Sequence, residues 1–302
     1  MTPTWGELLR ELDSELGERH ESRLILRAST ELPWGYLASH MDEPAEAEAV
    51  AVAHQRARER LSGRPLQWVL GTWGFRTIDV IVDGRALVPR PETEIVVEAA
   101  LGEADRIAAG REQRGDLVAL DLGTGTGVIA LSLALERQGL RVVATDRSPE
   151  ALALAAENLT RIAGEMDPAL ADRVELVESD WFAGLPRPMR GGFDLVVSNP
   201  PYIGGTEWAT LDPVVRDHDP YDALVAGPAG TEAVRLLVAE APHWLRPHGA
   251  LVVEMAPAQV GVARGWAEAG FAEVDVVRDM AGRPRGLVCR VGPAGGKVPP
   301  GW

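Results

Sequence analysis

The chain has 302 residues, 46% of them hydrophobic, and a formal net charge of −15 at pH 7. This length predicts about two domains, and no apolar run approaches the ~20 residues that a membrane-spanning helix needs. The acidity argues against a nucleic-acid substrate, because binding to phosphates needs a basic surface. One cysteine and six scattered histidines argue against a disulfide and against a metal site. With no secretory signal visible at the amino terminus, we expect a cytoplasmic protein.

Residues 1–73 are predicted to form a small helical domain. Apolar residues recur at helical spacing from Leu8 to Leu16, and an alanine-rich helix is expected to follow Pro44 and to end near Leu61. A bundle of this kind is typical of a module that docks a partner protein. A purely structural cap is the alternative.

Residues 74–90 are predicted to form a β-hairpin that connects two domains. Apolar and polar residues alternate there, and Asp83-Gly84 is the expected turn between two apolar runs. The next segment, Arg90 to Glu94, has a proline and two acids where a helix would begin. Helix capping therefore explains Glu92 and Glu94 at least as well as ligand contact does, and we regard neither as catalytic.

From residue 91 to 292 the pattern predicts an α/β domain, with residues 293–302 as a flexible tail. Candidate strands lie at 117–121, 140–145, 174–178, 193–198, 249–255, 272–278 and 286–291. Strands that alternate with helices predict a mainly parallel, doubly wound sheet, and seven strands match the Rossmann-like fold of methyltransferases that use S-adenosylmethionine. In such a sheet the ligand lies at the carboxyl ends of the strands.

A glycine-rich turn follows the first of these strands. Asp121 precedes Gly123-Thr124-Gly125-Thr126-Gly127. Alternate glycines let the backbone approach a ligand and leave the first amides of the next helix free. The spacing is neither the dinucleotide fingerprint nor a phosphate loop. The acid suits a cofactor with an ammonium group, such as S-adenosylmethionine.

Polar side chains also end the next two strands. Asp146 is placed to accept the two ribose hydroxyls of a cofactor, because Ser148 is the better cap for the helix that follows. Asp180 and Trp181 follow the third strand, where they can contact an adenine base. A strand-end turn with a half-buried tryptophan is the alternative for this pair, and a nicotinamide cofactor is the competitor for the whole site.

The fourth strand ends in Asn199-Pro200-Pro201-Tyr202. The asparagine carbonyl can accept a hydrogen bond from an NH2 group. The prolines fix the backbone, which makes the Pro200 carbonyl a second acceptor, and Tyr202 supplies an aromatic wall. The tetrapeptide alone also fits a strand that ends in a proline turn. Polar residues at the ends of four successive strands, however, favour a ligand site at this edge of the sheet.

The chain resembles the HemK/PrmC-type family of release-factor glutamine N5-methyltransferases. The matching segments, in family order, are Val88–Glu94, Asp121–Gly127, Ser179–Phe182, Asn199–Tyr202, Asp219–Leu224, Glu254 with Gln259, and Asp279–Arg285. The most specific part is the combination of Arg90–Glu94 with Asn199–Tyr202. The chain departs from the family at His218-Asp219-Pro220 and at the extra proline, Pro228.

This resemblance implies methyl transfer from S-adenosylmethionine to the glutamine amide nitrogen in the Gly-Gly-Gln loop of class 1 release factors. It implies that Asn199, Pro200 and Tyr202 act in catalysis and that Pro201 completes the substrate site. The cofactor would be bound by Asp121, Gly123, Thr124, Gly125, Thr126, Gly127, Asp146, Asp180, Trp181 and Asn199. We expect a monomer without metal, membrane or direct nucleic-acid partners.

Three alternatives remain at this point. An enzyme that methylates exocyclic amines of DNA or RNA bases shares the Asn-Pro-Pro-Tyr tetrad, but it would be expected to carry a basic binding face. A glutamine methyltransferase that acts on a ribosomal protein would use the same chemistry. A non-catalytic S-adenosylmethionine-binding module would have a broken amine site, whereas the tetrad is intact in this chain.

Overall fold

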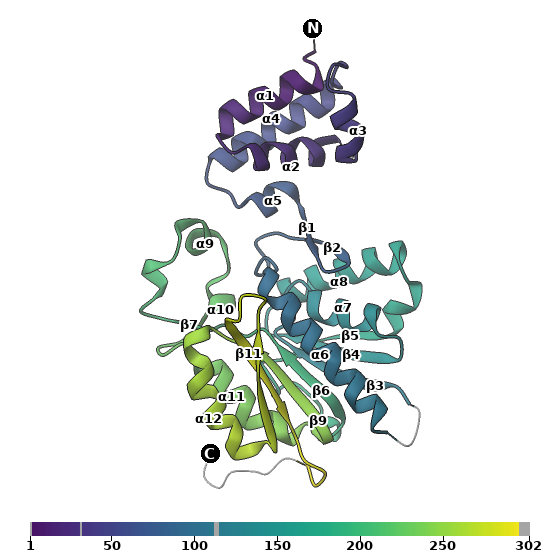
Figure 1. Ribbon diagram of the computed structural model, residues 1–302, viewed down its shortest axis with the longest axis vertical. Coiled ribbons are helices and arrows are strands. Elements are labelled where there is room, and N and C mark those ends of the chain that lie inside the picture. The colour runs from purple at the N-terminus through teal and green to yellow at the C-terminus, as the bar shows by residue number, and fades with distance from the viewer. Residues whose placement is uncertain (1, 31, 112–114, 296–302) are drawn as a thin grey trace. The chain divides into compact units, whose positions relative to one another are not determined.

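The computed structural model describes residues 2–30, 32–111 and 115–295 (Figure 1). The chain forms two compact units, and each is described by itself. The first comprises Met1–Trp73 and Asp212–His218, and the second comprises Gly74–Leu211 and Asp219–Trp302. Most of the predicted flexible tail, residues 296–302, lies outside the described residues.

The first unit is helical, as the apolar spacing predicted. Its helices are α1 (Trp5–Leu16), α2 (Arg19–Thr30), α3 (Trp34–Ser39), α4 (Ala47–Leu61), α5 (Leu66–Leu70) and α9 (Pro213–His218). Thr4 and Glu7 form a capping box that starts α1, and Gly17 ends it in the left-handed conformation. Leucines of α1 pack with the alanine face of α4 in one core, where small residues let the helices approach closely.

The segment Asp212–His218 belongs to the first unit, although we predicted it within the 91–292 domain. The ring of His218 meets the edge of the Trp68 ring at a centroid distance of 5.6 Å. This contact links two stretches of chain that are about 150 residues apart in sequence, so no local sequence pattern predicts it.

The predicted turn of the hairpin is wrong. The two strands are β1 (Thr72–Phe75) and β2 (Ile78–Ile81), so the chain reverses at Arg76 and not at Asp83-Gly84. Arg76 adopts a positive φ of 50°, and its guanidinium forms ion pairs with Glu136 and Glu98. Asp83 accepts the amide of Arg85 with its own side chain, which makes a separate local turn there.

A seven-stranded sheet forms the second unit, with strand order β10-β11-β9-β6-β3-β4-β5. Its strands are β3 (Leu117–Leu122), β4 (Leu140–Asp146), β5 (Val174–Glu178), β6 (Phe193–Ser198), β9 (Leu245–Glu254), β10 (Glu273–Arg278) and β11 (Pro284–Arg290). All are parallel to their neighbours except β11, which runs antiparallel to β9 and β10. The predicted fold class is confirmed, and every predicted strand is present.

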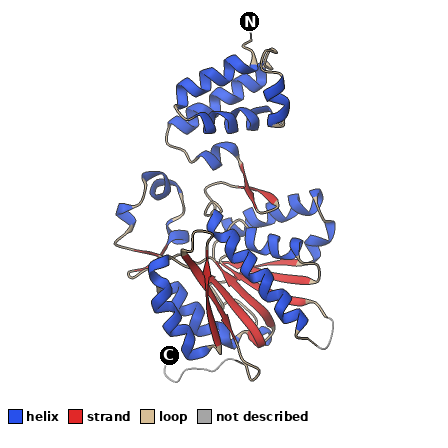
Figure 2. Cartoon of the chain, viewed as in Figure 1, coloured by secondary structure: helices blue, strands red, loops and turns tan. Residues whose placement is uncertain are grey.

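Helices cover both faces of this sheet (Figure 2). They are α6 (Pro91–Ala109), α7 (Val128–Glu136), α8 (Pro149–Glu165), α11 (Glu232–Glu240) and α12 (Val260–Gly270). The predicted start of α6 is confirmed, with Pro91 in its first turn together with Glu92 and Glu94. Every residue of β6 is buried, as expected for a central parallel strand covered on both sides.

A small two-stranded ladder lies after β6, where β7 (Ile203–Gly204) pairs with β8 (Val225–Gly227), and α10 (Tyr221–Leu224) leads into β8. Within the described ranges, no helix has both the length and the apolar content needed to cross a bilayer. The same residues contain no cluster of three or more histidine, cysteine or acidic side chains that could hold a metal ion.

Candidate active site

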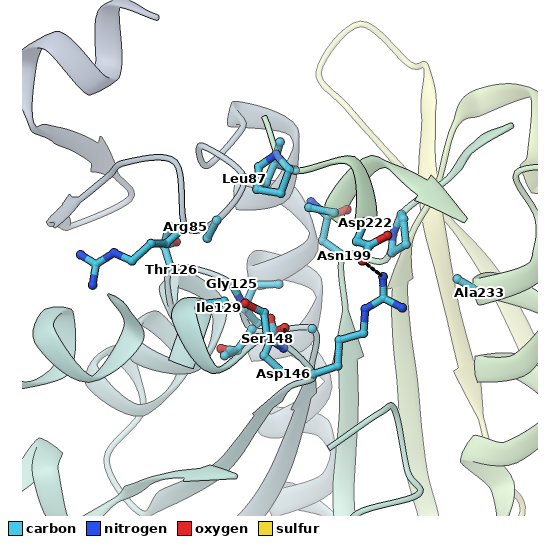
Figure 3. Close-up of a pocket in the computed structure, with 18 of the residues that line it drawn as sticks. Arg85, Leu87, Gly125, Thr126, Ile129, Asp146, Ser148, Asn199, Asp222 and Ala233 are labelled. Atoms are coloured by element: carbon cyan, nitrogen blue, oxygen red, sulfur yellow. Dashed lines mark hydrogen bonds and ion pairs between the residues drawn. The ribbon is translucent and has the colours of Figure 1, made fainter. Parts of the chain in front are cut away.

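A cavity of about 680 Å³ lies at the carboxyl ends of the central strands of the second unit. Its wall is made of residues 85–90, Thr93, the glycine turn, residues 146–151, residues 179–181, Asn199, Pro201 and parts of the segment 220–236. Figure 3 shows Gly125, Asp146 and Ser148 gathered in one part of the wall, with Asn199 and Asp222 in another. The predicted strand-end site is therefore a real concavity.

The glycine turn lines this cavity from Gly123 to Thr126. Gly123, Gly125 and Gly127 have φ angles of 75°, 55° and 87°, a region that residues with a side chain rarely adopt. A Cβ on Gly127 would also lie 3.2 Å from the Leu131 side chain. At Gly123 a Cβ would meet no atom within 4 Å, so the backbone there faces open space.

Asp121 lies behind the turn and is not part of the cavity wall. It is fully buried and accepts hydrogen bonds from the Thr124 hydroxyl at 2.6 Å and from the Ala130 amide at 3.2 Å. Burial raises its pKa to about 7. Its Oδ1 atom has no hydrogen-bond partner among the described residues. Asp121 thus ties the turn to helix α7 and keeps one oxygen unused.

Asp146 lies in the wall at the end of β4. Its two oxygens accept the amides of Gly125 at 2.9 Å and Ser148 at 3.0 Å. The prediction that Ser148 caps α8 is confirmed, because its hydroxyl accepts the amide of Ala151 and Pro149 follows at the first helical position. Each Asp146 oxygen keeps a second lone pair that can accept a ligand hydroxyl.

Asp180 and Trp181 both line the cavity after β5. Trp181 has a φ of 51°, which is a strained conformation for a bulky side chain. Ser179 stabilises this turn, since its hydroxyl donates to the Trp181 carbonyl at 2.6 Å and accepts the Gly184 amide at 2.9 Å. The half-buried indole therefore has a fixed place in the wall.

Asn199 and Pro201 line the cavity, whereas Pro200 and Tyr202 do not. The Asn199 side chain donates from Nδ2 to the Thr93 hydroxyl oxygen at 2.9 Å. With its NH2 group engaged in this way, Asn199 has its carbonyl oxygen left as the free acceptor. Burial is the main cause that raises the pKa of Tyr202, so its phenol stays protonated at neutral pH.

The loop after Asn199 is tied to its neighbours by Gln259. The Nε2 atom of Gln259 donates to the Tyr202 carbonyl at 2.8 Å and to the Gly230 carbonyl at 2.9 Å. A side chain at Gly230 would lie 2.7 Å from the Gly204 amide nitrogen, so the two loops pack backbone to backbone. Both glycine and glutamine are therefore needed to hold the tetrad in place.

Several wall residues were missed in the sequence reasoning. The sequence pattern indicates only a helix start at Thr93 and only a connector at residues 85–90. Arg147 and Asp222 form an ion pair of 2.9 Å between β4's end and α10, drawn as a dashed line in Figure 3. A signal for Thr93 did exist, because it lies inside the most family-specific run of the sequence.

Comparisons with known proteins identify the family of the chain. Residues 6–71 match the PrmC N-terminal domain family, and residues 111–216 match the Methyltransferase small domain family. The chain is 41% identical to the release factor glutamine methyltransferase of Chlorobaculum tepidum, over 77% of this chain and 76% of that protein. It is 38% identical to the one of Cereibacter sphaeroides, over 90% of both. The chain belongs to the release factor glutamine methyltransferase family.

As a member of this family, the chain is a methyltransferase that depends on S-adenosylmethionine. Among solved structures, the catalytic domain of hMettl16 aligns with a TM-score of 0.51 at 14% identity, over 80% of this chain and 81% of that one. At this identity the likeness shows the fold alone. That fold agrees with the seven-stranded sheet described above.

Proposed function

We propose that this chain methylates the side-chain N5 nitrogen of the glutamine in the Gly-Gly-Gln loop of class 1 release factors. The observation that carries the proposal is the Asn199 amide, whose NH2 group is held by Thr93 and whose oxygen is left as an acceptor beside the cavity. The names of the relatives supply the substrate. We further propose that the chain acts as a monomer in the cytoplasm and takes no nucleic-acid substrate.

The cavity residues fit S-adenosylmethionine. Asp146 has spare lone pairs for the ribose hydroxyls, and the open backbone at Gly123 leaves room for the amino-acid end of the cofactor. The unused Oδ1 of Asp121 lies behind the same turn, where it favours a nearby positive charge. Asp180 and Trp181 offer an acceptor and a flat apolar surface for the adenine. When bound, S-adenosylmethionine supplies a methyl group on a positively charged sulfur, which is a good electrophile.

The task of the chain is then to present the amide nitrogen, which is a poor nucleophile because its lone pair is delocalised into the carbonyl. The Asn199 oxygen and the Pro200 carbonyl each accept one of the two amide hydrogens, which fixes the nitrogen and turns its lone pair toward the methyl group. Correct orientation of two reactants contributes ~7–11 kcal/mol in favourable cases. We propose that Tyr202, which lies outside the cavity wall, packs on the plane of the bound amide, where its ring would favour the sulfur charge.

No general base is required before methyl transfer. The methylated nitrogen carries one extra proton, which passes to water once the new N–C bond has formed.

The test is to incubate the protein with labelled S-adenosylmethionine and one of three acceptors: a class 1 release factor, the same factor with its Gly-Gly-Gln glutamine changed to alanine, or total RNA. We expect label on the intact factor alone, and mass spectrometry should place it on the glutamine. Label on RNA, or equal label on the altered factor, would show that the substrate is a different one. Ribosomal proteins serve as a fourth acceptor that separates the two glutamine substrates.

A further inference from the structure

Three elements of the second unit bring polar side chains together behind Asn199. Thr93 lies in the first turn of α6, Glu254 ends β9, and Asn199 follows β6. Strands β6 and β9 are neighbours in the sheet, with Ser198 opposite Val253. Thr93 and Glu254 are 2% and 3% exposed, so water does not compete for their hydrogen bonds.

The hydrogen bonds of this group have a defined direction. An ionised carboxylate can only accept, and the Thr93 side chain acts on Glu254 as a hydrogen-bond donor, which lowers the pKa of that carboxyl against the larger opposite effect of burial. While Glu254 is ionised, the single hydroxyl proton of Thr93 is therefore given to it. The lone pairs of the same oxygen are left for Asn199, which donates to it from Nδ2 at 2.9 Å. A donor at Asn199 is the only group that satisfies this arrangement.

The direction matters because the two ends of an asparagine amide have nearly the same size. Packing alone cannot tell the oxygen from the NH2 group, so a polar neighbour has to select the orientation. If the amide turned over, its NH2 group would face the NH2 group of the substrate glutamine. Two donors would then oppose each other, and the proposed clamp would lose one of its two acceptors.

The burial of Glu254 also indicates that this carboxylate has a role in the site. A carboxylate that is removed from water destabilises the folded chain unless it is well paired. One oxygen of Glu254, Oε2, has no hydrogen-bond partner in the described part of the chain. The charged and titratable groups that act on or respond to it are Glu92, Arg285 and Tyr202. An apolar residue would fill this place at lower cost, so the carboxylate has a use other than stability.

We propose that Thr93 is a positioning residue for methyl transfer, and that Glu254 directs the Thr93 hydroxyl so that the Asn199 oxygen faces the substrate. The inference rests on the proposed role of Asn199 as the amide clamp. It assigns a function in the reaction to the Arg90–Glu94 run, whose two acids lie in the first turn of α6 while the threonine between them reaches the site.

The test compares Thr93→Val, which keeps the shape of the side chain but removes its hydroxyl, with Thr93→Ser, which keeps the hydroxyl. Leaving a buried polar group unsatisfied costs on the order of 1–3 kcal/mol, so Thr93→Val should lower kcat about 5- to 150-fold. Thr93→Ser should stay within about threefold of the wild-type kcat, because the same hydrogen bonds can form. The affinity for S-adenosylmethionine should change little in both.

Glu254→Leu should lower kcat as Thr93→Val does, and the double variant should be no slower than the slower single variant, because both changes remove one shared path. If the losses of kcat in the two single variants simply added in the double variant, Thr93 and Glu254 would act independently, which would contradict the proposal. So would a Thr93→Val enzyme with wild-type kcat, or a Thr93→Ser enzyme as slow as Thr93→Val. Thermal unfolding of each variant identifies any that fail to fold, and Glu254→Leu still tests the inference if Thr93→Val does not fold, because wild-type kcat in that variant would contradict it.

A second readout needs neither substrate nor turnover. In a 15N-labelled protein, the Asn199 side-chain NH2 signals should show slow exchange with water in the wild type and in Thr93→Ser. In Thr93→Val they should shift and exchange faster. Unchanged NH2 signals in Thr93→Val would overturn the inference directly. If the wild type does not methylate a release factor but these signals behave as expected, the proposed substrate is wrong and the positioning role stands.

Discussion

The two units of the chain treat buried polar groups in opposite ways. In the part of the chain that the structure describes, Ser22 is the one buried polar side chain of the first unit, whereas thirteen others lie in the second. Ser22 donates to the carbonyl of Glu18, the residue just before its helix α2. In the second unit several partners are distant in sequence: Thr93 meets Asn199 and Glu254, and Asn158 meets Ile81. A buried polar group is costly, so its concentration marks the unit that performs chemistry.

The largest effect is expected at the clamp. Asn199→Ala removes one of the two proposed acceptors and should lower kcat about 10³-fold, the loss seen when one pre-organised hydrogen-bonding group is removed from an active site. The affinity for S-adenosylmethionine, measured by calorimetry, should stay within about tenfold, because the other wall residues are untouched. An active Asn199→Ala enzyme would remove the basis of the amide clamp.

The second prediction concerns pH. Burial raises the pKa of Glu254 from 4.5 to about 7. The folded chain holds this proton more tightly than the unfolded chain, so the stabilisation is complete below pH ~4.5 and is lost as the pH rises through about 7. Glu254→Gln should abolish this loss, which amounts to about 3 kcal/mol in the free energy of unfolding between pH 4.5 and 8.

The activity should depend on pH in the opposite direction to the stability, and kcat should rise with pH. Ionised Glu254 can only accept a hydrogen bond, so it directs the Thr93 hydroxyl best above pH ~7. The kcat of the wild type should therefore be higher there than at pH 6. The pKa of Asp121 is also raised to about 7. Because Asp121 is present in both the wild type and Glu254→Gln, its effect cancels when their free energies of unfolding are compared. The measurement is chemical denaturation of the wild type and of Glu254→Gln at several pH values between 4.5 and 8. If the free energy of unfolding depended on pH equally in both proteins, the argument from the burial of Glu254 would be wrong.

Asn158 is a control for Asn199, because its side chain serves the stability of the fold and lies outside the proposed reaction. Asn158 is fully buried and bonds the Ile81 amide at 2.7 Å, the Ile81 carbonyl at 3.1 Å and the Thr126 carbonyl at 2.9 Å. Asn158→Ala leaves these backbone groups unpaired and should lower the free energy of unfolding by about 2–3 kcal/mol. Chemical denaturation measures this directly. Asn199→Ala, by contrast, should change stability far less than it changes kcat.

The cofactor contact gives the next effect. Asp146→Ala should weaken the binding of S-adenosylmethionine by about 1.5–3 kcal/mol, the contribution of hydrogen bonds to a charged group. Calorimetry well below the unfolding temperature measures the change, since the variant also loses the hydrogen bonds to the Gly125 and Ser148 amides. Unchanged affinity would count against a ribose role for Asp146.

The smallest effect is expected in the first unit. Ser22→Ala removes a hydroxyl whose partner is the carbonyl four residues earlier, and alanine favours helices more than serine does. The free energy of unfolding should change by less than about 0.5 kcal/mol. A large loss of stability would show that the first unit also depends on its buried polar group, and the contrast between the units would fail.

Much of the second unit was predictable from local pattern. Its seven strands, the start of α6 and the Ser148 cap depend on residues within a few positions of one another. The site was predictable in part. Parallel strands bring their carboxyl ends to one edge, and that rule placed Asp146, Asp180 and Asn199 in the wall of one cavity.

The errors have a common cause. The hairpin turn was misplaced because Arg76, and not the Asp-Gly pair, is held by partners up to 60 residues away. Asp121 was expected to border the ligand directly, and Thr124 and Ala130 hold it just behind the turn, outside the cavity wall, so its part in binding the cofactor stays a prediction. In each case a contact that forms only in the folded chain outweighed a local preference.

The sequence by itself therefore determined the kind of fold, the glycine turn and the tetrad, because backbone conformation and periodic burial depend on near neighbours. Only the tertiary structure decided which way the Asn199 amide faces. That choice depends on Thr93, 106 residues before it, and through Thr93 on Glu254, on another strand. Spacing along the chain carries no trace of such a contact, since the energy of a directed hydrogen bond exists only once its donor and acceptor have been folded together.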